Sequence, residues 1–321
     1  RTGGFKPLPD HHDSMRQQRF CSLVLAALFL APLLIAAPEA LRAHTHEGVV
    51  YTSDQTWSGN MSLDEDVVIA SGATLLIESG TYINVTEDIT ITIQGNLQIQ
   101  GTTEAPVSIW GSWFAENSVQ ARWQGFLLDS GSVTSVLHAM ISDSRGGFDA
   151  ESGASLTIES THFTDSMIGV WNKGSMTGAG FECQSATTTC LRVDGTANLD
   201  TVTSSNSAGV VHIANGGDAT IDLIESDLDS DVLVLDGGST YSGEIQAAGF
   251  TRMIRASDSV TATVTPIATG SGETLVDATM VDGLELINGN STNITVSRIL
   301  IGTVQDIRLS SIEYQCDGTA N

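Results

Sequence analysis

The chain has 321 residues and a formal net charge of −25 at neutral pH. Residues 1–43 hold five of the 13 basic and three of the 38 acidic residues, so the remainder holds 8 basic and 35 acidic residues, with a single lysine at Lys173. This acidity argues against nucleic acids and anionic membranes as partners. It suits a monomeric protein of a saline habitat, or one that binds divalent cations.

An apolar segment at residues 21–37 lies near the start of the chain, and Arg16 and Arg19 precede it. Small residues follow it as far as Ala43. With Met15 as the first residue, this order predicts a signal peptide that is cleaved near Ala43. The segment is also close to the lower length limit of a membrane span, so a retained anchor is the alternative.

These features divide the chain into three regions. An upstream extension or scar spans 1–14, the signal peptide or anchor spans 15–43, and a secreted or extracytoplasmic domain, which can be incomplete at its C-terminus, spans 44–321. Cleavage before His44 would leave a free amine beside the imidazoles of His44 and His46, a combination that can bind Cu²⁺ or Ni²⁺.

The third region contains short segments in which apolar and polar residues alternate, without a sustained helical period. Alternation with a period of two predicts β-strands that bury one face, and the abundant Thr, Val and Ile suit such strands. The clearest segments are, in chain order, 73–77, 89–93, 97–99, 156–158, 260–264 and 294–296.

Five glycines recur at a constant interval: Gly153, Gly174, Gly195, Gly216 and Gly237. A fixed period of about 21 residues indicates stacked repeats that bury one another's apolar faces. A leucine-rich repeat would need a leucine framework that the sequence lacks. We therefore predict an all-β fold, a single-stranded parallel β-helix of about ten coils, with one period per coil and coils about 4.8 Å apart.

Two finer expectations follow from this repeat. The positions 170, 191, 212, 233 and 254 should form an inward column, with His212 as a histidine satisfied within the core. Residues around 50–70, including Trp57, should cap the open N-terminal end, which would otherwise be an exposed sheet edge.

Residues 72–85 and 95–109, followed by Trp123-Gln124-Gly125, resemble the opening coils of secreted right-handed parallel β-helix proteins, the pectin-lyase-like superfamily. The resemblance spans about 50–250. It implies a right-handed coil, but it leaves the activity open because the superfamily contains lyases, hydrolases and adhesins.

Two of the cysteines, Cys183 and Cys190, lie close together in the predicted secreted domain. Outside the cytosol they can close a disulfide within one coil, or they can remain unpaired. Cys316 would then be free or paired with a residue outside this chain.

Glu225, Asp227, Asp229 and Asp231 alternate with other residues, so an extended segment would point all four carboxylates to one side. Such oxygen ligands suit Ca²⁺. The resemblance implies that Ca²⁺ here could bridge to an acidic polysaccharide in a lyase. The alternative is a solvated acidic corner.

A second candidate set consists of Asp143, Arg145, Asp149 and, one coil later, Asp165. Carboxylates near an arginine resemble the acid and base groups of polysaccharide-cleaving relatives, with Arg145 as the candidate base. The alternative is that Arg145 pairs with neighbouring carboxylates.

The aromatic residues Trp110, Trp113 and Trp123 lie in or beside a segment, 110–124, that interrupts the repeat and is expected to bulge outward. Exposed Trp110 or Trp113 could stack on sugar rings, whereas Trp123 is expected to pack in the first full coil.

Four glycosylation sequons begin at Asn60, Asn84, Asn290 and Asn293. They matter only where the host glycosylates its secreted proteins.

Three functions remain open. The leading hypothesis is a non-catalytic secreted or cell-surface protein that binds extracellular polysaccharide or surface glycans. The second is a Ca²⁺-dependent lyase or hydrolase of acidic glycans, and the third is a structural module of a larger surface assembly. Clustered Asp and Arg in a groove would favour the enzyme, and a face lined by Thr, Ser and Asn would favour the other two.

Overall fold

The structure is a computed structural model in which residues 48–112, 114–115, 119–120, 122–279, 281–287, 290–301, 307–310 and 313–314 are described. They belong to one compact unit, Glu47–Asn321. The predicted signal segment, His44, His46, Trp113 and Cys316 lie outside the described residues, as do the side chains of Asn290 and Asn293.

Within the described ranges, no helix is long and apolar enough to cross a membrane.

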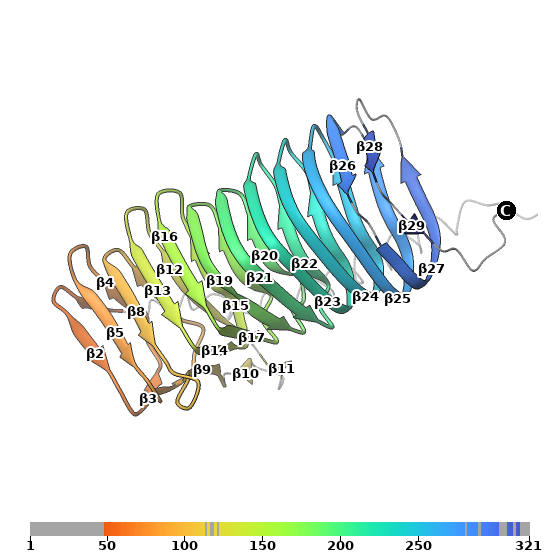
Figure 1. The fold of residues 1–321 in the computed structure, drawn as a ribbon. Helices are drawn as coiled ribbons and strands as arrows, with labels where there is room; N and C mark the ends of the chain where they lie inside the picture. The colour runs from red at the N-terminus through yellow and green to blue at the C-terminus, as the bar shows by residue number, and fades with distance from the viewer. Residues whose placement is uncertain are drawn as a thin grey trace, which may run out of the picture. The chain divides into compact units, whose positions relative to one another are not determined.

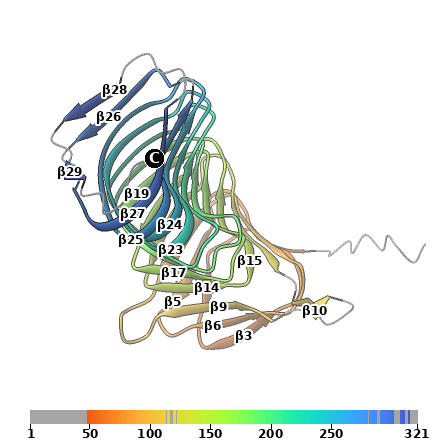
Figure 2. The ribbon, with the colours of Figure 1, turned by 90° about the vertical axis from the view of Figure 1, so that its right-hand side faces the viewer.

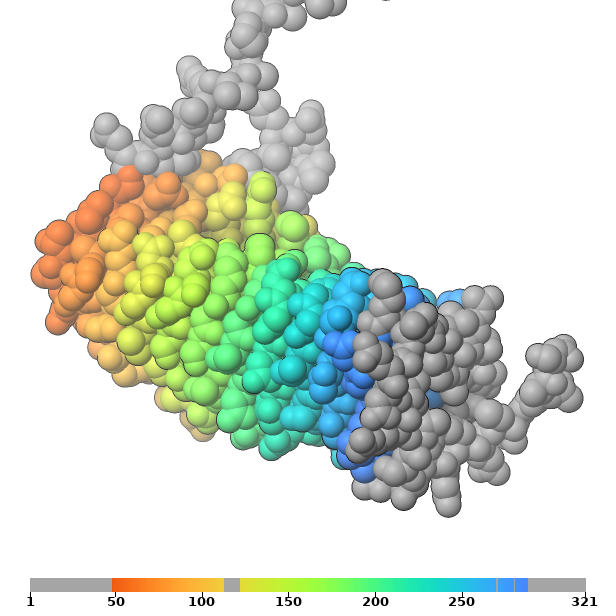
Figure 3. All heavy atoms as spheres, turned by 90° about the horizontal axis from the view of Figure 1, so that it is seen from above, coloured from red at the N-terminus to blue at the C-terminus, as the bar shows by residue number. Residues whose placement is uncertain are grey.

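The predicted fold class is confirmed, because the described chain forms a parallel β-solenoid of about 10 turns. Successive turns follow one another along the coil, as the ordered colours in Figure 3 show. Each full turn contributes one strand to each of three faces, which we name a, b and c (Figures 1 and 2). The hand of the coil stays a prediction.

The strands of the early turns each belong to one face. Face a contains β1 (Val49–Tyr51), β4 (Val67–Ile69), β7 (Thr90–Ile93), β12 (Trp123–Leu128), β15 (Ser144–Ala150), β18 (Ile168–Asn172), β20 (Thr189–Val193) and β22 (Gly209–Ile213). Face b contains β2 (Gln55–Trp57), β5 (Thr74–Glu78), β8 (Asn96–Gln100), β13 (Val133–Leu137) and β16 (Ser155–Glu159). Face c contains β3 (Asn60–Leu63), β6 (Tyr82–Val85), β9 (Val107–Gly111), β14 (Ala139–Ser142) and β17 (Thr161–Thr164).

Later strands run around the corners of the coil. Faces b and c share β19 (Ser175–Gln184) and β21 (Thr196–Ser205), and all three faces share β23 (Asp218–Leu235), β24 (Thr240–Ser257) and β25 (Thr261–Thr279). The last described strands are β26 (Gly283–Ile287), β27 (Asn290–Ile301), β28 (Ile307–Ser310) and β29 (Glu313–Tyr314). An antiparallel pair, β10 (Phe114–Ala115) and β11 (Val119–Gln120), stands apart from this sheet between β9 and β12.

The core fills the interior of the coil with stacked apolar columns. The inward column of face a consists of Ile91, Phe126, Phe148, Val170, Leu191, Val211, Leu233, Ile254 and Val276, all of them buried. Burying one such side chain stabilises the fold by roughly 1.5–3 kcal/mol. Aromatic rings link faces a and c inside the coil, with Phe148 edge-on to Phe163 at 6.1 Å between centroids.

The expected position of His212 was wrong. Leu191 pairs with Val211, so His212 pairs with the outward Arg192 instead. Its Nε2 lies 2.9 Å from Asp236 Oδ2 and the side chain is partly exposed. The reason is that the turn from Leu191 to Val211 is one residue shorter than the glycine interval. A shift of one residue moves a side chain to the other face of a strand.

The constant glycine interval does not correspond to one column either. Successive pairings join Ser155 to Ser175, Ser175 to Thr196 and Thr196 to Asp218, so each of these turns is one residue longer than the turn before it. The glycine at Gly195 stacks over Gly174, but the next turn places Gly217 rather than Gly216 in that column.

The residues expected to cap the N-terminal end are regular strands of the coil. β1, β2 and β3 pair in parallel with β4, β5 and β6. Trp57 is buried and pairs with Ile77, so the residues expected to cover the N-terminal end do so as the first turn of the stacked core.

Candidate functional site

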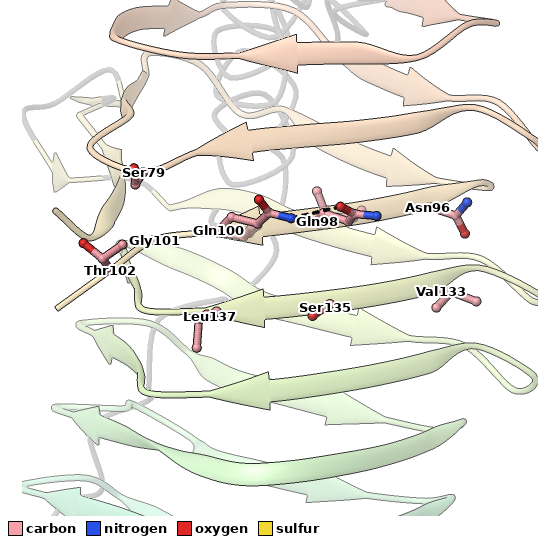
Figure 4. Close-up of a pocket in the computed structure, with 11 residues that line it drawn as sticks. Ser79, Asn96, Gln98, Gln100, Gly101, Thr102, Val133, Ser135 and Leu137 are labelled. Carbon is pink, nitrogen blue, oxygen red and sulfur yellow. Dashed lines mark hydrogen bonds between the residues drawn. The ribbon is translucent and has the colours of Figure 1, made fainter.

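One hollow lies on face b, where the outward side chains of β8 and β13 meet the chain that follows β5. Its volume is about 840 Å³. Outward amide and hydroxyl groups line it together with the aliphatic side chains of Val133 and Leu137. We call it the amide hollow and define it by Ser79, Asn96, Gln98, Gln100, Val133, Ser135 and Leu137 (Figure 4). Gln100 Nε2 donates to Gln98 Oε1 at 3.1 Å, which holds the two amides side by side. No ionisable side chain is among these residues.

Face b continues beyond the amide hollow as two outward columns of small polar side chains, which we call the hydroxyl ladder. One column contains Ser155, Ser175, Thr196, Asp218, Thr240 and Thr261, and the other Thr157, Thr177, Asn198, Thr220, Ser242 and Thr263. Most of these side chains are exposed. A face lined by Thr, Ser and Asn is the kind of surface that favours the binding and structural hypotheses over the enzyme.

A second hollow lies on face c and contains the predicted tryptophan. We call it the aromatic groove; its volume is about 260 Å³. Tyr82, Trp110 and Met140 line it and remain 40%, 52% and 48% exposed. They come from three successive turns. Tyr82 on β6 and Met140 on β14 pair with Ser108 of β9 from its two sides, and Trp110 lies further along β9. Large exposed apolar side chains that gather in a hollow favour contact with a ligand.

Polar groups surround the aromatic groove. Ser142, Asp143, Thr164 and Asp165 also line it. Ser142 Oγ donates to Asp143 Oδ2 at 2.9 Å, and the backbone oxygen of Asp165 accepts a hydrogen bond from Arg122 Nε at 2.8 Å. An apolar platform with a few convergent polar groups is the usual composition of a small-molecule or sugar site.

Part of the segment predicted to bulge outward leaves the coil between β9 and β12, and sugar contact by Trp110 stays a prediction. Trp110 is exposed at the end of β9, and the segment after it leaves the coil as β10 and β11. Trp123 is fully buried at the start of β12, and its Nε1 donates to the Ser142 oxygen at 3.0 Å. Trp113 lies outside the described residues.

The four catalytic candidates do not converge. Asp143 and Asp165 stack at one corner of the coil and border the aromatic groove, both with positive φ. Arg145 is exposed and lies 3.9 Å from Asp88 Oδ2, as the pairing alternative expects. Asp149 stands at the other end of β15 with Lys173 Nζ at 3.0 Å. Burial raises the pKa of Asp149 and the adjacent Lys173 opposes this rise.

The four carboxylates of the predicted calcium site do not share one face. Glu225 and Asp227 are exposed on face c, but Leu228 takes a left-handed conformation and turns Asp229 into the core. Asp231 accepts two hydrogen bonds from Arg252, at 2.7 and 2.8 Å. Among the described residues, no group of three or more His, Cys, Asp or Glu side chains is arranged to hold a metal ion.

The two cysteines lie in the core as free, buried thiols. Cys190 Sγ donates to Ser204 Oγ at 3.2 Å. Burial, with the Cys190 thiol beside it, raises the pKa of Cys183 well above its usual range. Their oxidation to a disulfide stays a prediction.

Two of the sequons border the aromatic groove. Asn84 pairs with Trp110. Asn60 lies one turn before Tyr82 and pairs with it. Modification at either position stays a prediction, as it does at Asn290 and Asn293.

Sequence reasoning missed the partners of Trp110 and the amides of face b. Tyr82 and Met140 are distant from Trp110 along the chain, one before it and one after it, and they meet it only because the turns stack. The outward positions of each strand carried these residues, but predicting which of them lie side by side requires the register of every turn.

A further cluster on face a also went unrecognised. Lys173 Nζ and Arg192 Cζ lie 4.2 and 4.8 Å from the Trp171 ring centroid, and Trp171 Nε1 donates to Asp194 at 2.9 Å. Every one of these groups has a partner, so the cluster stabilises face a rather than forming an open site.

No protein-family model, curated protein or solved structure matches the chain.

Proposed function

We propose that the protein is a secreted or cell-surface solenoid that binds glycans without cleaving them, and that the aromatic groove holds a sugar ring. The observation that carries this proposal is the gathering of Tyr82, Trp110 and Met140, all exposed, in one hollow bordered by hydroxyl and carboxylate groups. Aromatic faces offer a large contact area at low conformational cost, and the polar rim can orient sugar hydroxyls.

The fold supports the same proposal. A rigid stack of strands presents long surfaces on which residues of separate turns act together. We place the protein with the pectin-lyase-like β-helix proteins, as a right-handed monomeric member exported by its N-terminal segment. Arg145 and Asp149 lie towards opposite ends of β15 and pair with Asp88 and Lys173, so the geometry of these two groups lends no support to the alternative of polysaccharide cleavage.

Affinity electrophoresis tests the proposal. The acidic protein should migrate more slowly in native gels that contain a polysaccharide it binds, and Trp110→Ala should restore free migration for a ligand of the groove. Val50→Ala is the matched control, because Val50 is also exposed but lies on β1 of face a. Retardation that is unchanged in Trp110→Ala would refute the groove as the binding site.

A further inference from the structure

We infer that face b is a second, independent binding surface that takes an uncharged polysaccharide chain, anchored in the amide hollow and continued along the hydroxyl ladder. This surface is separate from the aromatic groove, which lies on face c. We expect it to bind uncharged chains and to exclude anionic ones.

The amide hollow provides the anchor. Its volume of about 840 Å³ accommodates more than one sugar ring, and three amide side chains extend into it from β8 (Figure 4). Amides both donate and accept hydrogen bonds, as sugar hydroxyls do. Val133, 54% exposed, and Leu137 add aliphatic surface for the C–H faces of a sugar.

The hydroxyl ladder extends this anchor along the axis of the coil. Its members repeat at the strand spacing of about 4.8 Å, and β-branched threonines have few rotamers to lose on binding. No register shift interrupts face b over these turns; the shifts of β23 and β24 fall at or beyond the end of their face b segments. Each turn therefore repeats the same hydrogen-bonding groups, as a linear polysaccharide repeats its own.

The charge distribution indicates a neutral ligand. From Ser155 to Thr263 the two columns contain one carboxylate, Asp218, and its side chain accepts a hydrogen bond from Thr240 Oγ1. Acidic residues border the ladder at the corners of the coil, namely Glu151, Asp194 and Asp236 on one side and Glu159, Asp200 and Asp222 on the other. The carboxylates of the first side pair with Lys173, Arg192 and His212. It is therefore the second side that repels a polyanion, whereas an uncharged chain can lie beside it.

Two probes with one backbone test the selection by charge: hydroxyethyl cellulose, which is neutral, and carboxymethyl cellulose, which is anionic. Dextran and galactomannan widen the neutral set. In native gels at about 0.15 M salt, where long-range repulsion is screened, at least one neutral polymer should retard the protein and carboxymethyl cellulose should not. Absence of retardation by every neutral polymer would overturn the inference.

Variants locate the surface. Ser135→Glu places a charge in the centre of the amide hollow and should raise the apparent dissociation constant about tenfold or more. Thr177→Val removes one ladder hydroxyl while keeping the side-chain shape and should weaken binding less. Thr92→Glu, which also points outward but from face a, should have no effect. Equal melting temperatures of the variants verify that each one is folded.

The outcomes separate the two surfaces. Binding of a neutral polymer that Ser135→Glu abolishes and Trp110→Ala leaves intact supports the inference. Binding that depends on Trp110 and is unchanged in Ser135→Glu overturns it and leaves the aromatic groove standing.

Discussion

At the scale of single residues, Asp229 shows how a corner changes the direction of a side chain. Leu228 has φ of +60°, and the residue after it points into the core instead of out. There the Asp229 carboxylate accepts hydrogen bonds from Ser207 N at 2.6 Å, Ser226 Oγ at 2.8 Å and Ser204 Oγ at 3.1 Å. A buried carboxylate with this many donors organises the surrounding chain.

Removal of this carboxylate should destabilise the protein. We expect Asp229→Ala to lower the free energy of unfolding by about 1–3 kcal/mol, because it leaves buried donors without an acceptor. Asp227→Ala, two positions away and exposed, should change it by less than about 0.5 kcal/mol. Urea unfolding of both variants measures the difference, and equal effects would show that the hydrogen bonds to Asp229 contribute nothing.

The pH dependence has a definite sign. Burial raises the pKa of Asp229 despite its hydrogen bonds from Ser207, Ser226 and Ser204, so the folded state binds the proton more tightly than the unfolded state. The stability that this group contributes is present below its ordinary pKa and is lost as the pH rises through the folded-state pKa. Relative to Asp229→Asn, the wild type should therefore lose stability between acidic and neutral pH. A relative gain over that interval in unfolding experiments would contradict this assignment.

Two tryptophans with opposite exposure provide a matched comparison. Trp123 is fully buried and packs edge-on against Phe126 at 5.7 Å, so Trp123→Ala should cost about 3–5 kcal/mol of stability. Trp110→Ala should cost far less, because half of its side chain is already in water. Thermal and denaturant unfolding test this order, and similar losses would mean that Trp110 has a structural role.

At the scale of turns and strands, Gly125 in β12 allows two turns to approach closely. Its φ is +107°, and a Cβ at this position would overlap the Gly146 oxygen of the next turn. We expect Gly125→Ala to cost about 3 kcal/mol or more. Gly131→Ala is the control: φ is +85°, but nothing lies near the added methyl group, so the cost should be about 1–2 kcal/mol. Unfolding midpoints decide, and equal costs would mean that only φ matters.

The strands were predictable and their register was not. Alternation identifies segments such as 97–99 and 156–158, both of which lie in strands of face b, because a period of two requires only local order. The register depends on the length of every turn, and turns that differ from one another by single residues cannot be recovered from a constant glycine interval. Because of this one-residue uncertainty, His212 was predicted to point inward although it points outward, and the outward columns of faces b and c were not predicted.

At the scale of the whole molecule, the excess of acidic residues opposes the compact state through self-repulsion. Salt screens such repulsion, so the melting temperature should rise as sodium chloride increases from about 10 mM to about 1 M. A melting temperature that falls, or stays constant, over this range would show that the acidic residues are already neutralised by their neighbours.

The fold class followed from the sequence because burial in a solenoid is repeated in every turn, so many weak local signals agree. The candidate sites did not follow in the same way. Trp110 was identifiable as an aromatic residue in an interruption of the repeat, but its neighbours Tyr82 and Met140 come from other turns. The acidic run of Glu225 to Asp231 appeared continuous, and the corner at Leu228 divides it.

The proposed function is binding without cleavage. The most direct measurement incubates the protein with the polysaccharide that retards it most and then determines the polymer's chain length by size-exclusion chromatography with light scattering. We expect the polymer to be bound and to be recovered at its original length. Shortened chains that depend on Asp143 or Asp165 would refute binding without cleavage and establish an enzyme.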